Sequence, residues 1–236
     1  MAGSVAGFVE PDPDLISPNP GGPEDPLGES ILDHNCPPQR IFEPADVRLV
    51  IGRHQQLRRE VLVEQALADG IPMHRRVSGG GAVVLAPGML VIARRLPQQS
   101  LLGDACLCAI AHAVVQAIAA CGGPPASVRG HGDVAVSDRA GRWRKVLGAS
   151  LRQRQRHLYY LGVLLVEDGV PLMQRYLCPP SRQPEYRAGR DHASFCAALA
   201  PHGLRIPPLA AALGSYIGQL EGPSLSGSDF PDHCPA

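Results

Sequence analysis

The most informative stretch of the chain is RRVSGGGAVV, over residues 75–84. Three consecutive glycines directly before an apolar strand remove every Cβ atom from a short span, so a ligand can lie against the backbone and receive its N–H groups. The two arginines before them supply charge for a phosphate or a carboxylate. The stretch has neither the GK[ST] of a phosphate-loop NTPase nor the GxGxxG of a dinucleotide fold, so alone it predicts only a glycine-rich ligand site.

A second candidate site lies in GHGD over residues 130–133 and KVLGAS over residues 145–150. Hairpin geometry places Asp133 and Lys145 on neighbouring strands, where they share one site if the register permits or form an ordinary cross-strand ion pair. Lys145 is the only lysine of the chain, beside 21 arginines. A single lysine in such a chain favours a place where a compact ammonium group is needed, and the small residues Gly148 and Ala149 would let a ligand approach it.

Composition excludes several classes of protein. The 236 residues carry 22 basic and 22 acidic side chains, and this balance argues against a nucleic-acid partner or an anionic lipid surface. The longest nearly apolar stretch, residues 105–121, is interrupted by His112 and Gln116 and is shorter than the ~20 residues that span a bilayer. We therefore expect a buried helix there and no membrane association. Because the N-terminus shows no secretory signal, we expect a cytoplasmic protein.

The seven cysteines are odd in number and include no CxxC pair, which favours free thiols over a disulfide framework. The nearest approach to a metal-ligand cluster is Cys106, Cys108 and His112, all on the expected buried helix. Residues two apart on a helix point in nearly opposite directions, so these side chains cannot easily share one metal ion. We expect no bound metal.

The pattern of apolar and turn residues predicts one folded domain between two polar segments. Proline, glycine and acidic residues dominate residues 1–36, which we expect to be a flexible leader, and residues 222–236 form a similar tail. The domain over residues 37–221 is predicted to have strands at 47–52, 82–85 and 89–93, and a three-strand meander from VAV through WRKVLGASL to HLYYLGVLLV. Helices are expected at 57–69, 105–121, 171–177, 191–200 and 208–220. The fold class is therefore α+β, with a mixed, largely antiparallel sheet packed with helices.

Five ordered blocks together resemble the lipoate–protein ligase family, over about residues 40–204. They are IGRHQQ (51–56), RRVSGGGAV (75–83), GHGD (130–133), KVLGAS (145–150) and LGVLL (161–165), against family patterns IGRxQ, RRxSGGGAV, GRND, KxSGxA and HHGTLL. The resemblance implies the fold shared with biotin ligases and class II synthetases. It also implies an enzyme that attaches lipoate or octanoate to a lysine of a lipoyl-domain carrier, of the 2-oxoacid dehydrogenase E2 or glycine cleavage H protein type.

The resemblance assigns roles to particular residues. Lys145 would contact the carbonyl and phosphate oxygens of an activated acyl group and stabilise the charge that develops during transfer. Asp133 would supply a carboxylate towards a metal ion or the nucleotide. The substrate-binding set implied by the matching blocks is Arg76, Ser78, Gly79, Gly80, Gly81, Ala82, Asp133, Gly148, Ala149 and Gly162.

The sequence leaves the reaction type open. A ligase would use ATP and Mg²⁺ through an acyl-adenylate and, since the residues after 204 are too few for the family's accessory domain, would need a separate accessory chain. An octanoyltransferase would instead form a cysteine thioester. Cys178, in YLCPP, lies near the place where one such group carries its nucleophile, and a nearby ammonium favours a thiolate. A third hypothesis is a non-catalytic acyl or partner binder, because several polar family residues are replaced here. A biotin ligase would require a GRGRxG loop, which the sequence lacks.

Overall fold

The computed structural model describes residues 15–19, 25–97 and 103–220. Its strands are β1 (Gln39–Phe42), β2 (Arg48–Ile51), β3 (Met73–Arg75), β4 (Val83–Leu85), β5 (Met89–Pro97), β6 (Ala126–Arg129), β7 (Asp133–Ser137), β8 (Trp143–Arg154) and β9 (His157–Leu165). Its α-helices are α1 (Leu57–Glu60), α2 (Val63–Ala68), α3 (Gly103–Ala120), α4 (Val170–Tyr176), α5 (His192–Phe195) and α6 (Ile206–Gly218). Short 3-10 helices are η3 (Glu29–Leu32), η5 (Glu185–Arg187) and η6 (Ala200–His202).

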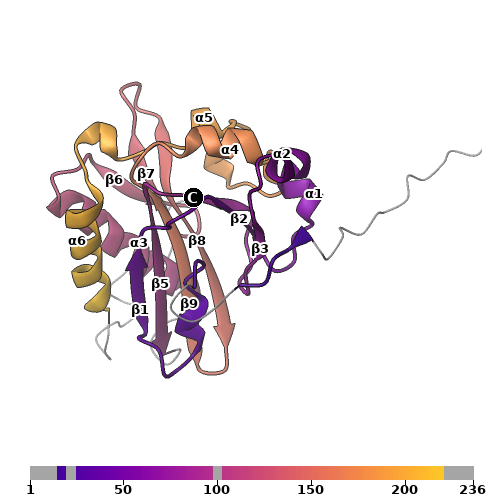
Figure 1. The fold of residues 1–236 in the computed structure, drawn as a ribbon. Coiled ribbons are helices and arrows are strands. Elements are labelled where there is room, and N and C mark those ends of the chain that lie inside the picture. The colour runs from indigo at the N-terminus through magenta and orange to yellow at the C-terminus, as the bar shows by residue number, and fades with distance from the viewer. Residues whose placement is uncertain (1–14, 20–24, 98–102, 221–236) are drawn as a thin grey trace, which may run out of the picture.

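The main layer is a six-stranded antiparallel sheet in the order β1-β5-β9-β8-β7-β6. Helices α3 and α6 pack together beside it (Figure 1), and the largest apolar cluster of the protein lies at this contact. Helix α3 is long and apolar enough to cross a membrane, but 56% of it is buried in the domain, as expected for a core helix. The apolar run over residues 105–121 therefore forms the buried helix that the sequence predicts.

A smaller sheet in the order β3-β2-β4 lies on the other side of the molecule with α1 and α2 (Figure 1). Strand β2 pairs parallel with β3 and antiparallel with β4. A second apolar cluster joins this sheet to α4 and α5. The prediction of an α+β fold with a mixed, largely antiparallel sheet is confirmed, and so is the meander, since β7, β8 and β9 are neighbours in sequence and in the sheet.

The helix predicted over residues 57–69 is wrong in one respect, because it is broken into α1 and α2. Val61 forms an antiparallel bridge with Leu177, and the N–H of Leu62 donates to the carbonyl of Tyr176 at 2.8 Å. A tertiary backbone contact replaces the helical hydrogen bonds at this point. The helix predicted at 191–200 is likewise shorter, since only His192–Phe195 is α-helical.

The prediction of a flexible leader is wrong in two described parts of it, because Ser17 forms a parallel bridge with His74 of β3 and residues 25–32 contact the main sheet. The backbone from Glu29 to Leu32 forms η3, and Leu27 and Ile31 are buried against the main sheet. The carboxylate of Asp25, 1% exposed, accepts hydrogen bonds from the N–H groups of Leu27 and Ser30. A buried carboxylate satisfied in this way orders the segment, a feature that its proline-rich composition hides. Residues 1–14 and 20–24 of the expected leader, and the whole of the expected tail, lie outside the described residues.

The expectation of free thiols is confirmed at five cysteines: Cys36, Cys106, Cys121, Cys178 and Cys196. It is wrong at Cys108, which is disulfide-bonded. Within residues 15–19, 25–97 and 103–220, no group of three or more His, Cys, Asp or Glu side chains is placed to hold a metal ion.

Candidate active site

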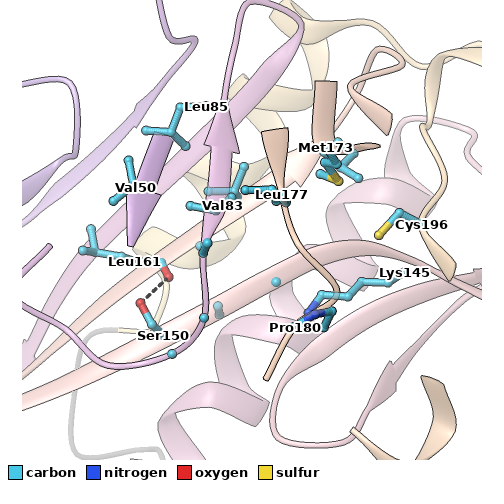
Figure 2. Close-up of a pocket in the computed structure, with 18 of the residues that line it drawn as sticks. Val50, Val83, Leu85, Lys145, Ser150, Leu161, Met173, Leu177, Pro180 and Cys196 are labelled. Atoms are coloured by element: carbon cyan, nitrogen blue, oxygen red, sulfur yellow. Dashed lines mark hydrogen bonds between the residues drawn. The ribbon is translucent and has the colours of Figure 1, made fainter. Parts of the chain in front are cut away.

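A cavity of about 230 Å³ lies where the two sheets meet. Its apolar lining comes from both sheets and includes Val50, Val83, Leu85, Val91 and Val163. Figure 2 shows Val50 and Leu85 towards one end of the cavity, and Lys145 and Cys196 towards the other. The cavity therefore has an apolar end and a polar end, the shape expected of a site for a fatty chain with a charged head.

The triple-glycine loop forms one wall of the cavity, and Arg76 holds that loop in shape. The Arg76 guanidinium donates to the carbonyl of Gly79 at 2.6 and 3.0 Å and to that of Gly81 at 2.8 Å. Burial lowers the pKa of Arg76 to about 10, while Glu29 and Glu60 oppose this shift. Arg76 lines the cavity as predicted, but its polar atoms are engaged by the loop, so its main role is to position the glycines.

One glycine of the loop, Gly80, is required by its backbone conformation and by a close contact. A Cβ atom on Gly80, whose φ is +90°, would lie 2.7 Å from the Arg76 Nη2 atom. Gly80, Gly81 and the following Ala82 line the cavity, whereas Gly79 lines only the neighbouring cavity described below.

Ser78 does not line either cavity. Its side chain is buried, and its Oγ atom lies 2.9 Å from the Oγ of Ser150 on β8. Ser150 does line the cavity, and its hydroxyl faces the carbonyl of Leu161 on β9 at 3.4 Å (Figure 2). The predicted ligand contact of Ser78 is therefore replaced by a structural contact that ties the glycine loop to the main sheet.

Lys145 projects from β8 into the cavity, and its Nζ atom lies 2.7 Å from the Oδ1 of Asp133. The two side chains are 25% and 14% exposed. The pairing of β7 with β8 shifts here, because Val134 lies opposite Leu147 and Ala135 lies opposite Lys145, so Val146 is the extra residue of a bulge in β8. The structure thus brings together the lysine and the carboxylate that the sequence placed on neighbouring strands.

Gly148 makes room for this ammonium group. A Cβ atom at Gly148 would lie 2.8 Å from the Cε and 2.9 Å from the Nζ of Lys145. Gly148 and Ala149 both line the cavity, and Ala149 pairs with Gly162 of β9, which lines it too. The small residues predicted around the lysine are therefore at the site.

Asp133 does not itself line the cavity, and its oxygens already have partners. One oxygen is paired with Lys145, and the other accepts a hydrogen bond from the Tyr186 hydroxyl at 2.9 Å. Burial, followed by the charge of Asp133, raises the pKa of Tyr186, which keeps this hydroxyl protonated and able to donate. These contacts fit an orienting role for Asp133 towards Lys145 better than the predicted direct contact with a metal ion or nucleotide.

Cys178 is not among the residues that line the cavity. Its N–H donates to the carbonyl of Glu60 at 3.0 Å, and burial, together with the Glu60 charge, raises the pKa of its thiol. The arrangement expected of an activated nucleophile, a thiol beside the Lys145 ammonium, is therefore absent at Cys178. Its place is taken by Cys196, which lines the cavity and forms a parallel backbone bridge with Lys145.

Burial raises the pKa of the Cys196 thiol, while the charge of Lys145 acts in the opposite direction. Sequence analysis missed Cys196 because no recognisable motif surrounds it. Sequence patterns also failed to predict four other cavity residues from this part of the chain, for the same reason: Arg182, Arg187, His192 and Phe195.

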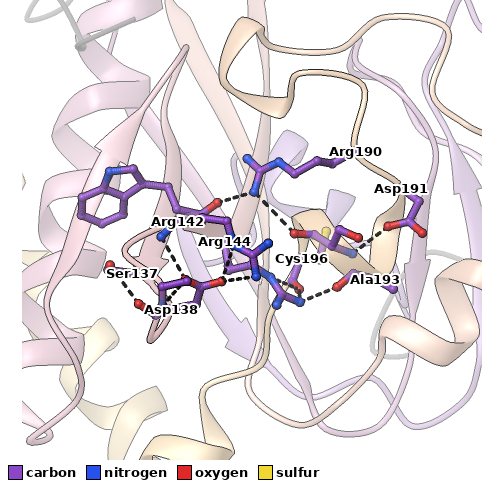
Figure 3. A network of polar contacts seen from close by, with 11 residues as sticks. Ser137, Asp138, Arg142, Arg144, Arg190, Asp191, Ala193 and Cys196 are labelled. Atoms are coloured by element: carbon purple, nitrogen blue, oxygen red, sulfur yellow. Dashed lines mark hydrogen bonds and ion pairs between the residues drawn. The ribbon is translucent and has the colours of Figure 1, made fainter.

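Arginines hold this missed segment against the main sheet (Figure 3). Arg144, next to Lys145 on β8, donates to the carbonyls of Cys196, at 3.1 Å from its Nε atom, and of Ala193. Arg190 donates to the carbonyl of Trp143 at 2.9 Å. The only sequence signal for these contacts was the density of arginines, which does not reveal their partners.

A second cavity, of about 490 Å³, lies beside the triple-glycine loop. Its lining is mostly polar: His54, Gln55, Gln56, Arg59, Gly79, Gly80, Ser181 and Arg182. Gly80 and Arg182 line both cavities. The site therefore has a largely apolar compartment and a polar one, which adjoin at Gly80 of the triple-glycine loop and at Arg182.

A family model described as the Lipoyl protein ligase A/B catalytic domain matches residues 34–207, and the chain belongs to this family. Among curated proteins, it is 26% identical over 141 residues to a lipoate-protein ligase A of Blochmanniella pennsylvanica, covering 58% of this chain and 39% of that protein. It is 34% identical over 76 residues to a protein of Aeropyrum pernix, covering 32% of this chain and 28% of that protein. The chain thus matches well under half the length of these curated relatives.

Solved structures show the same fold. A bipartite lipoate protein ligase with its E2 lipoyl domain from Thermoplasma acidophilum superposes with a TM-score of 0.68 at 19% identity, covering 86% of this chain and 81% of that chain. A lipoate-protein ligase A bound with ATP gives a TM-score of 0.67 at 19% identity, covering 87% and 83%. The predicted family and its fold are confirmed.

Proposed function

We propose that this protein attaches lipoate or octanoate to the ε-amine of a lysine on a lipoyl-domain carrier, by way of an acyl-adenylate. One observation carries the proposal: an apolar cavity ends at the ammonium of the only lysine in the chain and beside the triple-glycine loop. Family membership supports it, since the match covers both the loop and the lysine.

In this proposal the acyl chain occupies the apolar end of the cavity, and its carboxyl group lies at Lys145. A carboxylate oxygen attacks the α-phosphorus of ATP, and pyrophosphate leaves. The carrier amine then attacks the acyl carbonyl carbon, the bond to the AMP oxygen breaks, and the amine loses a proton to solvent. The Lys145 ammonium, held by Asp133, stabilises the negative charge on the carbonyl and phosphate oxygens during both steps.

The polar cavity, which adjoins the acyl cavity at Gly80 and Arg182, supports a nucleotide site there. His54 and Arg182 line it and provide donors for phosphate or ribose oxygens. Because the described residues offer no three-ligand metal cluster, Mg²⁺ would enter with the phosphates of ATP and not as a resident ion. The lipoate-protein ligase A of similar fold described above is bound with ATP, which is consistent with a nucleotide in the polar cavity.

The carrier and an accessory chain are the proposed partners. The Thermoplasma acidophilum structure with a similar fold is a bipartite ligase described together with its E2 lipoyl domain. We therefore propose an E2-type or H-protein-type lipoyl domain as the acceptor, and a separately encoded accessory chain as a requirement for the adenylation step.

An ATP-independent transferase is the second candidate, and the position of Cys196 beside Lys145 in the cavity favours it. In that reaction the thiolate attacks the carbonyl of a thioester donor, the donor thiol leaves, and the carrier amine then displaces Cys196. The raised pKa of Cys196 argues against this route at neutral pH, because little thiolate is present.

The test is to incubate the full chain with a lipoyl domain and one of three donors: lipoate with ATP and Mg²⁺, octanoate with ATP and Mg²⁺, or an octanoyl thioester without ATP. A mass increase of the carrier with either ATP mixture supports the ligase. An increase only with the thioester supports the transferase. If no donor modifies the carrier, with or without an added accessory chain, while the acyl group still binds, the protein is a binder and the proposal fails.

A further inference from the structure

The segment from Asp25 to Leu32 lies before the region that matches the family, which starts at residue 34. Leu27 nevertheless lines the main cavity and is only 3% exposed. Part of the acyl cavity is therefore built by residues outside the matched region.

Leu27 belongs to the apolar end of the cavity. It packs in one cluster with Val50, Leu85 and Val91, all of which also line the cavity. The next residue, Gly28, has a φ of +74°, and a Cβ atom there would lie 2.9 Å from the Cβ of Ala93 on β5. Only glycine lets the segment lie this close to the sheet, and the side chain of Leu27 therefore packs at the apolar end of the cavity.

The distance from Leu27 to the lysine follows from the strand register. Gly148, which contacts the Lys145 side chain, pairs with Val163 on β9, and Val163 pairs with Val91 on β5. Two strand spacings, or about 10 Å, therefore separate Gly148, beside the end of the Lys145 side chain, from Val91, on which Leu27 packs. An extended eight-carbon acyl chain, with seven C–C bonds of about 1.5 Å in a zigzag, has a length of roughly 9 Å.

The segment is anchored firmly enough to act as a wall. Asp25 accepts from Ser30 N–H at 2.6 Å and forms an ion pair with Arg40 at 2.8 Å. Glu29 accepts a hydrogen bond at 2.7 Å from the N–H of Val77, in the stretch that carries the glycine loop. These contacts tie the segment to β1 on one side and to the glycine loop on the other.

We propose that Leu27 closes the cavity and sets the longest acyl chain that the protein accepts, at about eight carbons. The inference rests on the proposed function and adds to it the residue that limits the length of the acyl chain. Its physical basis is that each further methylene would have to displace a buried, anchored side chain.

The test measures binding of straight-chain fatty acids with 6 to 14 carbons to the full chain by titration calorimetry. The wild type is expected to bind the eight-carbon acid best. In Leu27→Ala the optimum moves to ten carbons or more, with each methylene that enters the vacated space tightening binding about four-fold. Leu27→Trp, a larger side chain, is expected to move the optimum to six carbons.

Ile31→Ala is the matched control, because Ile31 lies on the same segment and is buried, but packs in a different cluster and does not line the cavity. It should lower the free energy of unfolding and keep the eight-carbon optimum. An unchanged optimum in folded Leu27→Ala and Leu27→Trp, or an equal shift in Ile31→Ala, overturns the inference. A wild type that binds acyl chains without a length optimum overturns it as well, but leaves the proposed function standing. A wild type that binds none of the acids, nor lipoate, overturns the proposed function and this inference with it.

Discussion

Replacing Gly148 by alanine tests whether the exact place of the Lys145 ammonium matters. The new Cβ atom would lie 2.8 Å from the Lys145 Cε and 2.9 Å from its Nζ. Since uncharged carbon atoms rest at about 3.5 Å or more, the lysine end must retreat by roughly 0.7 Å. It can do so at little cost, because it is the far end of a flexible side chain. The fold should survive, while the ion pair with Asp133 lengthens.

A displacement of about 1 Å at a catalytic group can cost 10²-fold in rate, so we expect Gly148→Ala to lower the transfer rate by about 30-fold to 100-fold. Lys145→Met, which removes the ammonium, should cost about 10²-fold to 10³-fold. The double variant should be no slower than Lys145→Met alone, since both changes act through one group. The free energy of unfolding of Gly148→Ala should stay within about 1 kcal/mol of the wild type.

The assay follows the mass of a lipoyl domain over time with the best donor, beside urea unfolding of each variant. Gly214→Ala in α6 is the control, because its Cβ would meet nothing closer than 4.0 Å and the residue does not line the cavity. Wild-type transfer by a folded Gly148→Ala variant would refute the argument that the position of the ammonium controls the reaction.

Four further outcomes follow from the geometry. Arg76→Met removes the cation that holds the glycine loop and leaves the charges of buried Glu60 and of Glu29 uncompensated, so urea unfolding should show a loss of about 3 kcal/mol. Cys178→Ser should keep ATP-dependent transfer within two-fold of the wild type, and abolished transfer would identify a nucleophile outside the cavity. Because burial raises the pKa of Cys196, its alkylation by iodoacetamide, followed by mass spectrometry, should accelerate as the pH rises above 9.0, the ordinary value. Lys145→Met should slow that alkylation further, and fast labelling at neutral pH would contradict the raised pKa. Hydrogen bonds from Arg175 and Tyr176 lower the pKa of Asp69 from 3.8 to about 2, so its stabilising contribution is complete above 3.8 and is lost as the pH falls towards 2. Asp69→Asn should therefore flatten the pH dependence of unfolding in that window, and an unchanged slope would be evidence against the shift.

Short-range patterns in the sequence predicted much of the fold. Alternating apolar residues gave the meander, the apolar run gave α3, and the glycine stop after residue 121 marked its end, where Gly122 has a φ of +73°. The break between α1 and α2 could not be predicted, because it depends on a bridge from Val61 to Leu177, more than a hundred positions away.

The candidate site was predicted unevenly for the same reason. The glycine loop, Lys145 and Gly148 carry signals in their own neighbourhood, and the structure places them around one cavity. Ser78 and Arg76 were predicted as ligand contacts, but their polar atoms are used to hold the loop. Which of the two cysteines lies beside Lys145 depends on tertiary contacts. The backbone of Cys196 forms a bridge with β8, whereas that of Cys178 donates a hydrogen bond to α1, and no local sequence pattern predicts either contact.

The sequence by itself determined which chemical groups are available: one ammonium, one carboxylate on the adjacent strand, and one stretch of backbone without side chains. These are properties of residue type and of periods of a few residues, which local sterics and hydrogen bonding fix. Only the tertiary structure decided how far the ammonium lies from the apolar end, which thiol stands beside it, and that Leu27 belongs to the cavity. Those distances arise from strand register and from the packing of segments remote in the chain, and both depend on burying the whole apolar surface at once.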